Sequence, residues 1–233
     1  MLIYNGAALE DIAPAQIVDI TVSPVKQKVT SRSRAILSGE DFVRIRGETR
    51  TIKVTFALLT QDADARAAQA QAVRRWSAAT QPKRLLLPDR QTQYINAVCT
   101  TPPEISIREW WKVCNMTFTA YDPFFADTDE HSVSCGTGFE VSGSSAPDMR
   151  IQADLLVAVP TPSWIWNDQK AIFLSGAVGP GHLIIDLTHQ TITLDGVSIM
   201  TQYKWVVSDF FAPQLGFNVI DGRGRVYWRE RWE

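Results

Sequence analysis

Short strand-like runs separated by turn residues fill almost the whole chain, and a single stretch has the pattern of a helix. The clearest period-two alternation lies in Ile105 to Tyr121, where one face carries Cys114, Met116, Phe118 and Ala120. Such alternation is typical of a half-buried antiparallel strand, and Pro123 follows it because proline cannot donate to a β-ladder. The chain is therefore predicted to be mainly β.

The helical stretch is Asp62 to Thr80, which is rich in alanine and contains neither glycine nor proline. Its spacing predicts a buried face of Ala65, Ala68, Ala72, Val73 and Trp76, with Arg66, Gln69 and Arg74 facing solvent. Carboxylates at the start and arginines near the end both suit the helix dipole. We predict one amphipathic helix packed on a sheet.

Other runs predict further strands and turns. Phe42 to Arg46 and Thr51 to Leu58 are interpreted as a hairpin about Gly47-Glu48, preceded by a long polar loop from Lys26 to Gly39. In the second half, strands are expected at 149–159, 171–174, 182–187, 191–194 and 226–232. The pairs Asp195-Gly196 and Asp221-Gly222 predict tight turns.

A change of composition divides the chain. Ala126 to Gly138 is acidic and then small and polar, which is typical of a linker or a domain boundary. We predict an N-terminal domain over 1–130, a β-sandwich or barrel with a helix. A second domain over 136–233 is predicted to be a β-sandwich of strands joined by short turns.

Composition and charge exclude several classes of protein. The 233 residues are 45% hydrophobic with a formal net charge of −2, which excludes a disordered chain and argues against nucleic-acid or membrane binding. No apolar run approaches the roughly 20 residues of a membrane span, and the first residues do not resemble a signal peptide. Three separated cysteines predict reduced thiols and a reducing compartment.

Motifs for chemistry are missing. The sequence contains no Gly-x-Ser-x-Gly, Ser-x-x-Lys or phosphate-loop motif, and we predict no catalytic, cofactor or metal residues. His182 and His189 fit either a metal pair across a hairpin or two solvated side chains, and the second interpretation is favoured. For Asp127 to His131, a solvated linker is favoured over a calcium loop. Acidic pairs for glycoside hydrolysis do not show in sequence, and such an enzyme is the least favoured alternative.

Five tryptophans in the second half permit two interpretations. Aromatic rings stack on sugars, which would make this half a non-catalytic carbohydrate-binding module contacting host cell-wall sugars. The favoured interpretation is that they fill a sandwich core and an interface. The residues are Trp164, Trp166, Trp205, Trp228 and Trp232.

Lys26 to Lys53 holds eight basic and three acidic residues, a local net charge of +5. Phe42 is its single aromatic residue, so stacking on nucleic acid is disfavoured and an acidic protein partner is preferred. The predicted interface residues are Lys26, Lys28, Arg32, Arg34, Arg44 and Arg46. The acidic stretch Asp127 to Glu130 is a candidate complementary surface.

The order of segments resembles a known family. Ile3-Tyr4-Asn5-Gly6 opens the chain, Arg50 to Phe56 precedes the helix, Leu85 to Asp89 follows it, and an aromatic strand ends in Tyr121 to Phe125. The second half has Leu183 to Asp186, Thr191 to Gly196, Ser208 to Phe211, Leu215 to Asn218 and Tyr227 to Trp232. This succession resembles the distal tail proteins of long-tailed (siphovirus-type) phages or prophages. One departure is Gly39-Glu40-Asp41-Phe42, where many members have Gly-x-Asp-Gly.

The resemblance implies a structural virion protein rather than an enzyme. It implies a ring-forming N-terminal domain, an outward galectin-like or carbohydrate-module-like C-terminal sandwich, and a six-fold homohexameric ring at the tail tip. The implied partners are further copies of the chain, the tail tube protein, the tail-tip hub protein and the receptor-binding proteins used in host attachment. The implied site of synthesis is the bacterial host cytoplasm. The galectin sugar motif His-x-Asn-x-Arg is missing from the sequence.

Overall fold

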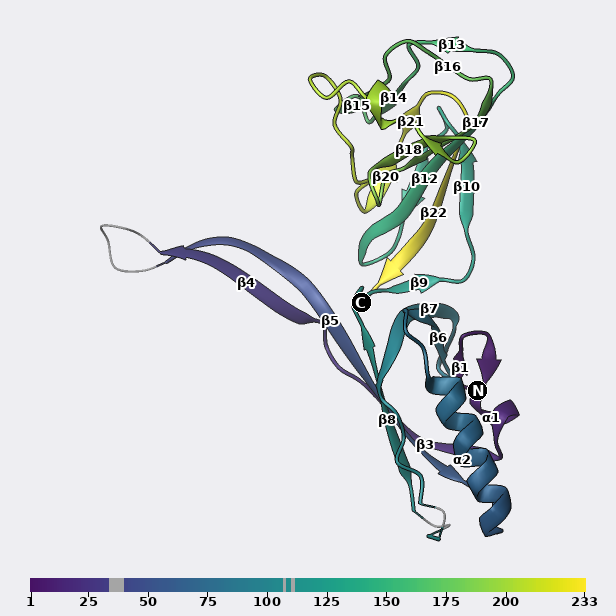
Figure 1. The fold of residues 1–233 in the computed structure, drawn as a ribbon. Coiled ribbons are helices and arrows are strands. Elements are labelled where there is room, and N and C mark those ends of the chain that lie inside the picture. Colours follow the sequence, from purple (N-terminus) through teal and green to yellow (C-terminus); the bar gives the residue numbers. More distant parts are fainter. Residues whose placement is uncertain (34–39, 107, 110–111) are drawn as a thin grey trace. The chain divides into compact units, whose positions relative to one another are not determined.

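The computed structural model describes residues 1–33, 40–106, 108–109 and 112–233, and between 27 and 47 it describes backbone alone. The chain divides into two compact units, Met1–Phe125 with Glu233, and Ala126–Trp232. Both are built mainly from antiparallel strands, which confirms the predicted fold class (Figure 1). Among the described residues, none of the helices has the length and apolar character needed to span a membrane.

The first unit is an antiparallel sheet with helices against it. Its order runs β2–β1–β6–β7–β8–β5–β3, and β4 pairs with the other half of β5. The elements are β1 (Ile3–Tyr4), β2 (Ala7–Ala8), α1 (Leu9–Ile12), β3 (Ala15–Val22), β4 (Lys26–Ser33), β5 (Glu40–Leu58), α2 (Ala63–Ser77), β6 (Lys83–Leu87), β7 (Arg90–Thr101) and β8 (Cys114–Ala120).

The core of this unit follows the predicted alternation. On β8, Cys114, Met116, Phe118 and Ala120 are buried, which confirms that face. They lie opposite β5, where Val54 pairs with Met116 and Ile52 pairs with Phe118. Residues 105–113 precede β8, so the strand is shorter than predicted. The divergence of the chain before Cys114 opens a groove that is described below.

Helix α2 is confirmed, and its predicted buried face is right at Val73 and Trp76 but wrong in its first two turns. Asp62 caps the helix by accepting a hydrogen bond from the Ala65 backbone N–H at 2.7 Å. Ala65 and Ala68 are exposed, whereas the side chain of Arg66 is fully buried. An alanine gains little free energy from burial, so a large side chain that finds partners decides which face turns inward.

Aromatic contacts hold α2 on the sheet. The ring centroids of Tyr4 and Phe118 lie 4.9 Å apart, and Trp76 meets the Tyr4 ring edge-on at 5.7 Å. The Trp76 indole also donates to the Ala7 carbonyl at 2.9 Å. These contacts join α2, β1 and β8 into one core.

Two sequence predictions fail between residues 26 and 58. Instead of a hairpin about Gly47-Glu48, β5 is one continuous strand and the hairpin is formed by β4 and β5. The ladder shifts register where Lys26 faces Thr49 and Gln27 faces Gly47, so Gly47 adjoins an irregularity rather than a turn. The predicted polar loop from Lys26 is strand β4 as far as Ser33, and residues 34–39 lie outside the described residues.

The second unit is a β-sandwich. One sheet has the order β19–β18–β17–β12–β22–β10, and β14, β15 and β21 form another. The elements are β9 (Phe125–Asp127), β10 (His131–Ser134), β11 (Phe139–Val141), β12 (Ser145–Leu155), β13 (Val159–Pro160), β14 (Ser163–Trp166), β15 (Lys170–Phe173), β16 (Ala177–Val178), β17 (Gly181–Asp186), β18 (Thr191–Leu194), β19 (Val197–Ser198), η1 (Met200–Gln202), β20 (Gly216–Asn218), β21 (Ile220–Asp221) and β22 (Arg225–Trp232).

Turn chemistry in this unit agrees with the sequence. Asp195 and Gly196 have φ of +50° and +78° and join β18 to β19, where Leu194 pairs with Val197. Two consecutive positive φ values are the signature of a type I′ hairpin turn. The predicted pairing of the strands at 182–187 and 191–194 is also confirmed.

The predicted linker is largely structured. Residues 126–138 contain the end of β9 and all of β10, which pairs with β22. Its acidic residues have partners inside the unit, because Glu130 makes a bidentate ion pair with Arg150 at 2.6 and 2.7 Å. Composition indicates a polar stretch here, but it does not separate solvated carboxylates from paired ones.

Candidate assembly surfaces

A two-stranded ribbon extends from the first unit. β4 and the first part of β5 run outward from the sheet, as Figure 1 shows, whereas the rest of β5 lies between β3 and β8. We call residues 26–33 and 40–49 the arm. Among the described residues, β4 pairs with β5 alone. A ribbon of two strands is only marginally stable in water, which makes the arm an element that benefits from a further partner.

Most of the sequence-predicted interface residues are brought together on this arm. β4 carries Lys26, Lys28 and Arg32, and β5 carries Arg44 and Arg46. Lys28 and Arg46 occupy directly opposed register positions, an arrangement of like charges that disfavours the isolated ribbon. Arg34, like Gly39 of the family departure, lies outside the described residues. The arm therefore concentrates positive charge that an acidic surface would relieve.

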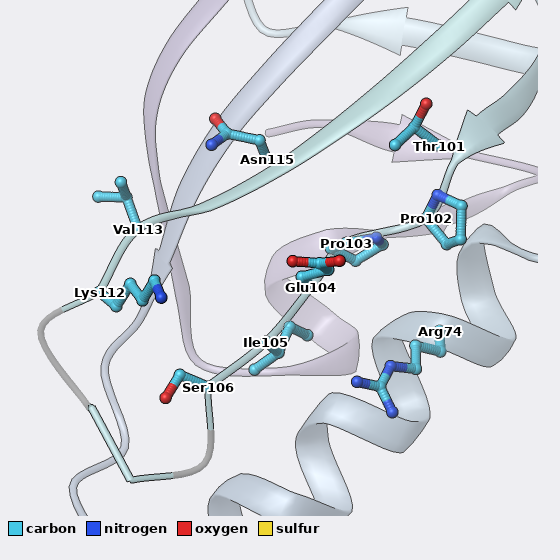
Figure 2. A pocket seen from close by; sticks show the side chains of 10 residues that line it. All are labelled: Arg74, Thr101, Pro102, Pro103, Glu104, Ile105, Ser106, Lys112, Val113 and Asn115. Atoms are coloured by element: carbon cyan, nitrogen blue, oxygen red, sulfur yellow. The ribbon is translucent and has the colours of Figure 1, made fainter.

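A groove opens in the first unit where β7 and β8 separate. Their pairing ends at Thr101 and Thr117, and Pro102-Pro103 cannot donate hydrogen bonds to continue the ladder. The groove has a volume of about 800 Å³. Figure 2 shows Arg74 of α2 facing the segment that contains Pro103 and Ile105, with Lys112, Val113 and Asn115 on the other wall.

Arg66 holds one wall of this groove in place. Its guanidinium donates to four backbone carbonyls, those of Ser106 at 2.7 Å, Thr60 at 3.0 Å, Leu58 at 3.2 Å and Glu109 at 3.3 Å. These bonds join the end of β5 and α2 to the segment before β8. Sequence analysis missed this role, since the only signal was an arginine between alanines.

The groove has little capacity for hydrolytic chemistry. Among its described lining residues, Glu104 is the one carboxylate, and Arg74 and Lys112 are cations. Glycoside hydrolysis uses two carboxyl groups on either side of the scissile bond. Among the described residues, there is also no group of three or more side chains placed to hold a metal ion.

The structure separates the two candidate histidines. His182 lies at the open end of the β17–β18 hairpin and contacts Asp154 at 2.6 Å, whereas His189 lies in the turn that joins these strands and contacts Asp186 at 2.8 Å. The two histidines therefore do not face each other across the hairpin, as the metal-pair alternative required. In the candidate calcium loop, Trp232 donates to the Asp127 carboxylate at 2.9 Å and His131 stacks on Trp228. Glu130 is held by Arg150, so one of the three carboxylates in Asp127 to Glu130 already has a cation as its partner, and the role of this stretch as the acidic partner of the arm stays a prediction.

The tryptophans serve different purposes. Trp164, Trp166 and Trp228 are buried in the sandwich core, and Trp232 is half-buried. Trp205, in contrast, is largely exposed. Stacking on a sugar needs an accessible ring, so Trp164 and Trp166 do not support the carbohydrate-binding alternative.

All three cysteines are free, as predicted. Burial raises the pKa of the Cys135 thiol to about 11, and it raises the pKa of Cys99 and Cys114 as well. These thiols therefore stay protonated and poorly nucleophilic at neutral pH.

Comparison with known proteins gives a match in structure alone. No protein-family model matches the chain, and a search of curated proteins finds no match. The fold is shared with a protein of a phage hub adsorption apparatus. It is similar to the Dit protein (gp 19.1) of phage SPP1, described as a paradigm of the hub adsorption apparatus in phages that infect Gram-positive bacteria, with a TM-score of 0.77 and 14% sequence identity over 100% of this chain and 98% of that chain.

A weaker likeness is to the phage P2 baseplate in its activated conformation with Ca, with a TM-score of 0.48 and 7% identity over 94% of this chain and 90% of that chain. The likeness to SPP1 Dit alone confirms, at the level of the fold, the resemblance to distal tail proteins stated from the sequence.

Proposed function

We propose that the chain is a structural subunit of a phage tail tip, or of a prophage-encoded tail, which forms a ring through its first unit. The observation that carries this proposal is the full-length likeness to SPP1 Dit, at a TM-score of 0.77, together with the arm. A ring subunit needs a surface that meets a different surface on the next copy. The arm, whose strand β4 pairs with β5 alone among the residues that the structure describes, is also positively charged and suits one half of such a contact.

In this proposal the ring lies between the tail tube protein and the tail-tip hub protein, and the second unit is available to receptor-binding proteins. The chain would turn over no substrate. A sugar-binding role for the second unit is not preferred, because the aromatic residues that suggested it are mostly buried. Whether that sandwich is galectin-like stays a prediction.

Removing the arm should abolish ring formation without unfolding the first unit. Replacing residues 27–47 by a short Gly-Asn turn leaves the pairing of β5 with β8 (Arg50 to Phe56) and with β3 (Ile52 to Leu58) in place. We expect association in the micromolar range to be lost, and amide exchange in β8 to stay within roughly threefold of the parent, because the pairing of β5 with β3 and β8 is kept. Mass photometry and hydrogen exchange measure the two results.

A charge-reversed pair gives a finer version of the same test. Lys26→Glu with Lys28→Glu should weaken ring formation on the order of tenfold or more, through lost electrostatic complementarity. The matched control is Lys53→Glu with Arg75→Glu, both exposed residues on the body of the unit. If the protein without the arm forms rings equally well, the arm is not part of the ring interface.

A further inference from the structure

Strand β3 is an edge of the sheet in the first unit. Among the residues that the structure describes, β3 pairs with β5 alone, and we call its other side the open edge. None of its eight residues is buried, although they include Ile17, Val18, Ile20 and Val22. Val18, where the ladder with β5 shifts register, is 58% exposed. A strand rich in β-branched residues with an unpaired edge is a template for a further strand, and the register shift restricts which strands fit.

The hydrogen bonds to β5 show which backbone groups the open edge offers. The Ser23 N–H donates to the Thr51 carbonyl at 2.9 Å, so Ser23 bonds toward β5. In an antiparallel pair, successive residues bond alternately toward the partner strand and away from it. Counted back through the register, Val22 and Ile20 direct their N–H and C=O groups to the open edge. A strand laid there would find donors and acceptors at a regular spacing.

The charge of β3 is opposite to that of the arm. Asp19 is the one charged residue of β3; it is exposed, and its hydrogen bond comes from the Thr21 hydroxyl at 3.0 Å. Lys53 faces Thr21 across the ladder, but no ion pair with Asp19 forms in the part of the chain that the structure describes. β4 of the arm carries three cations and no acid. Two arms side by side would therefore repel each other, whereas an arm on the open edge meets a carboxylate.

The position of the arm along β5 gives the geometry of such a contact. Val22 of β3 faces Ile52, and Lys26 of β4 faces Thr49, so the two strands follow each other along the same side of β5. A copy displaced along this side by about eleven residues, or roughly 36 Å at 3.3 Å per residue, has its β4 beside β3 of the first copy. The displacement has one direction, so repetition is head-to-tail, as ring closure requires.

We propose that the arm of one copy lies along the open edge of the next copy and extends its sheet by a parallel ladder. The inference rests on the proposed ring, to which it adds the surface that receives the arm. Main-chain hydrogen bonds from Ile20 and Val22 would supply affinity, and the pairing of arm cations with Asp19 would favour the correct register. A two-fold exchange of arms is the alternative arrangement, and it would end at a dimer.

A charge swap in the full-length protein tests the contact. The edge variant is Gln16→Lys with Asp19→Lys, both at exposed positions of β3, and the arm variant is Lys26→Glu with Lys28→Glu. Each variant alone should associate more weakly on the order of tenfold or more, because like charges then meet. An equimolar mixture should recover association to within about threefold of the parent, since every contact between alternating variants joins opposite charges. A single chain with all four changes should recover equally.

The matched control is Gln81→Lys with Asp89→Lys, which adds the same charge at exposed positions outside β3 and should leave association within about threefold of the parent. Mass photometry over a concentration series measures association, and hydrogen exchange in β5 verifies the fold of each variant. An edge variant that assembles like the parent, or a mixture without recovery, would overturn the inference. The arm would then meet Asp127 to Glu130 or another tail protein, and rings of the parent would retain the proposed function. Recovery in assemblies that end at dimers would refute the ring and retain the contact.

Discussion

Replacing Arg66 with methionine should destabilise the first unit by about 3–5 kcal/mol, because four charge-assisted hydrogen bonds are lost and their carbonyls are left inside the protein. Methionine keeps the unbranched shape and the helix propensity, so the loss reports the guanidinium. Arg66→Lys should recover less than half of this free energy, since an ammonium group cannot span the same fork of acceptors.

The measurement is the rate of amide hydrogen exchange in peptides from β5 and β8 of the full chain. These peptides belong to the first unit, so their exchange reports its stability separately from that of the second unit. An effect of this size corresponds to exchange that is faster by roughly two to three and a half orders of magnitude, about tenfold for each 1.4 kcal/mol. Arg75→Met, an exposed arginine on the same helix, should change exchange by less than about threefold. Comparable exchange in the Arg66 and Arg75 variants would show that the buried guanidinium is not a structural anchor.

Trp164→Ala should destabilise the second unit by about 3–5 kcal/mol, the usual cost of removing a large aromatic residue from a core. The Trp164 side chain is fully buried, and its indole donates to the Arg223 carbonyl at 2.8 Å. A carbonyl left without that donor adds to the cost of the cavity. Faster exchange throughout β12 and β22 is the expected observation.

The matched control is Trp205→Ala, which removes the same side chain from an exposed loop position; it loses one edge-on contact with Tyr203 and should lower the free energy of unfolding of the unit by less than about 1.5 kcal/mol. The pair also separates two explanations of any lost sugar binding. Lost binding in Trp164→Ala would reflect unfolding, whereas loss in the folded Trp205→Ala protein would indicate a real sugar contact. A fully stable Trp164→Ala protein would contradict the core assignment.

Local patterns predicted the parts of the fold that cover a core. The alternation on β8, the helix that begins after Asp62 and the turn at Asp195-Gly196 depend on near neighbours in sequence, and the structure confirms all three. The prediction that Arg66 of α2 faces solvent was wrong, because its guanidinium donates hydrogen bonds to backbone carbonyls as far as 43 residues away in the sequence. Helical periodicity does not contain that information.

The candidate surfaces were predicted in part. Charge counting located the basic segment, but a strand that covers no core lacks apolar alternation, so β4 was assigned to a loop. Residue composition also did not indicate that Glu130 is paired with Arg150. Nor did it indicate that, of the five tryptophans named above, Trp205 alone is largely exposed. These properties depend on which strands become neighbours, and that is decided by packing across the whole unit.

The central claim is that this chain works by holding copies of itself together, and the most direct test is the mass and shape of the purified full chain. Mass photometry and negative-stain images at micromolar concentration, with and without the tail tube protein, should show closed rings with the predicted six-fold symmetry. A protein that stays monomeric at every concentration and in the presence of the tube protein would contradict the account.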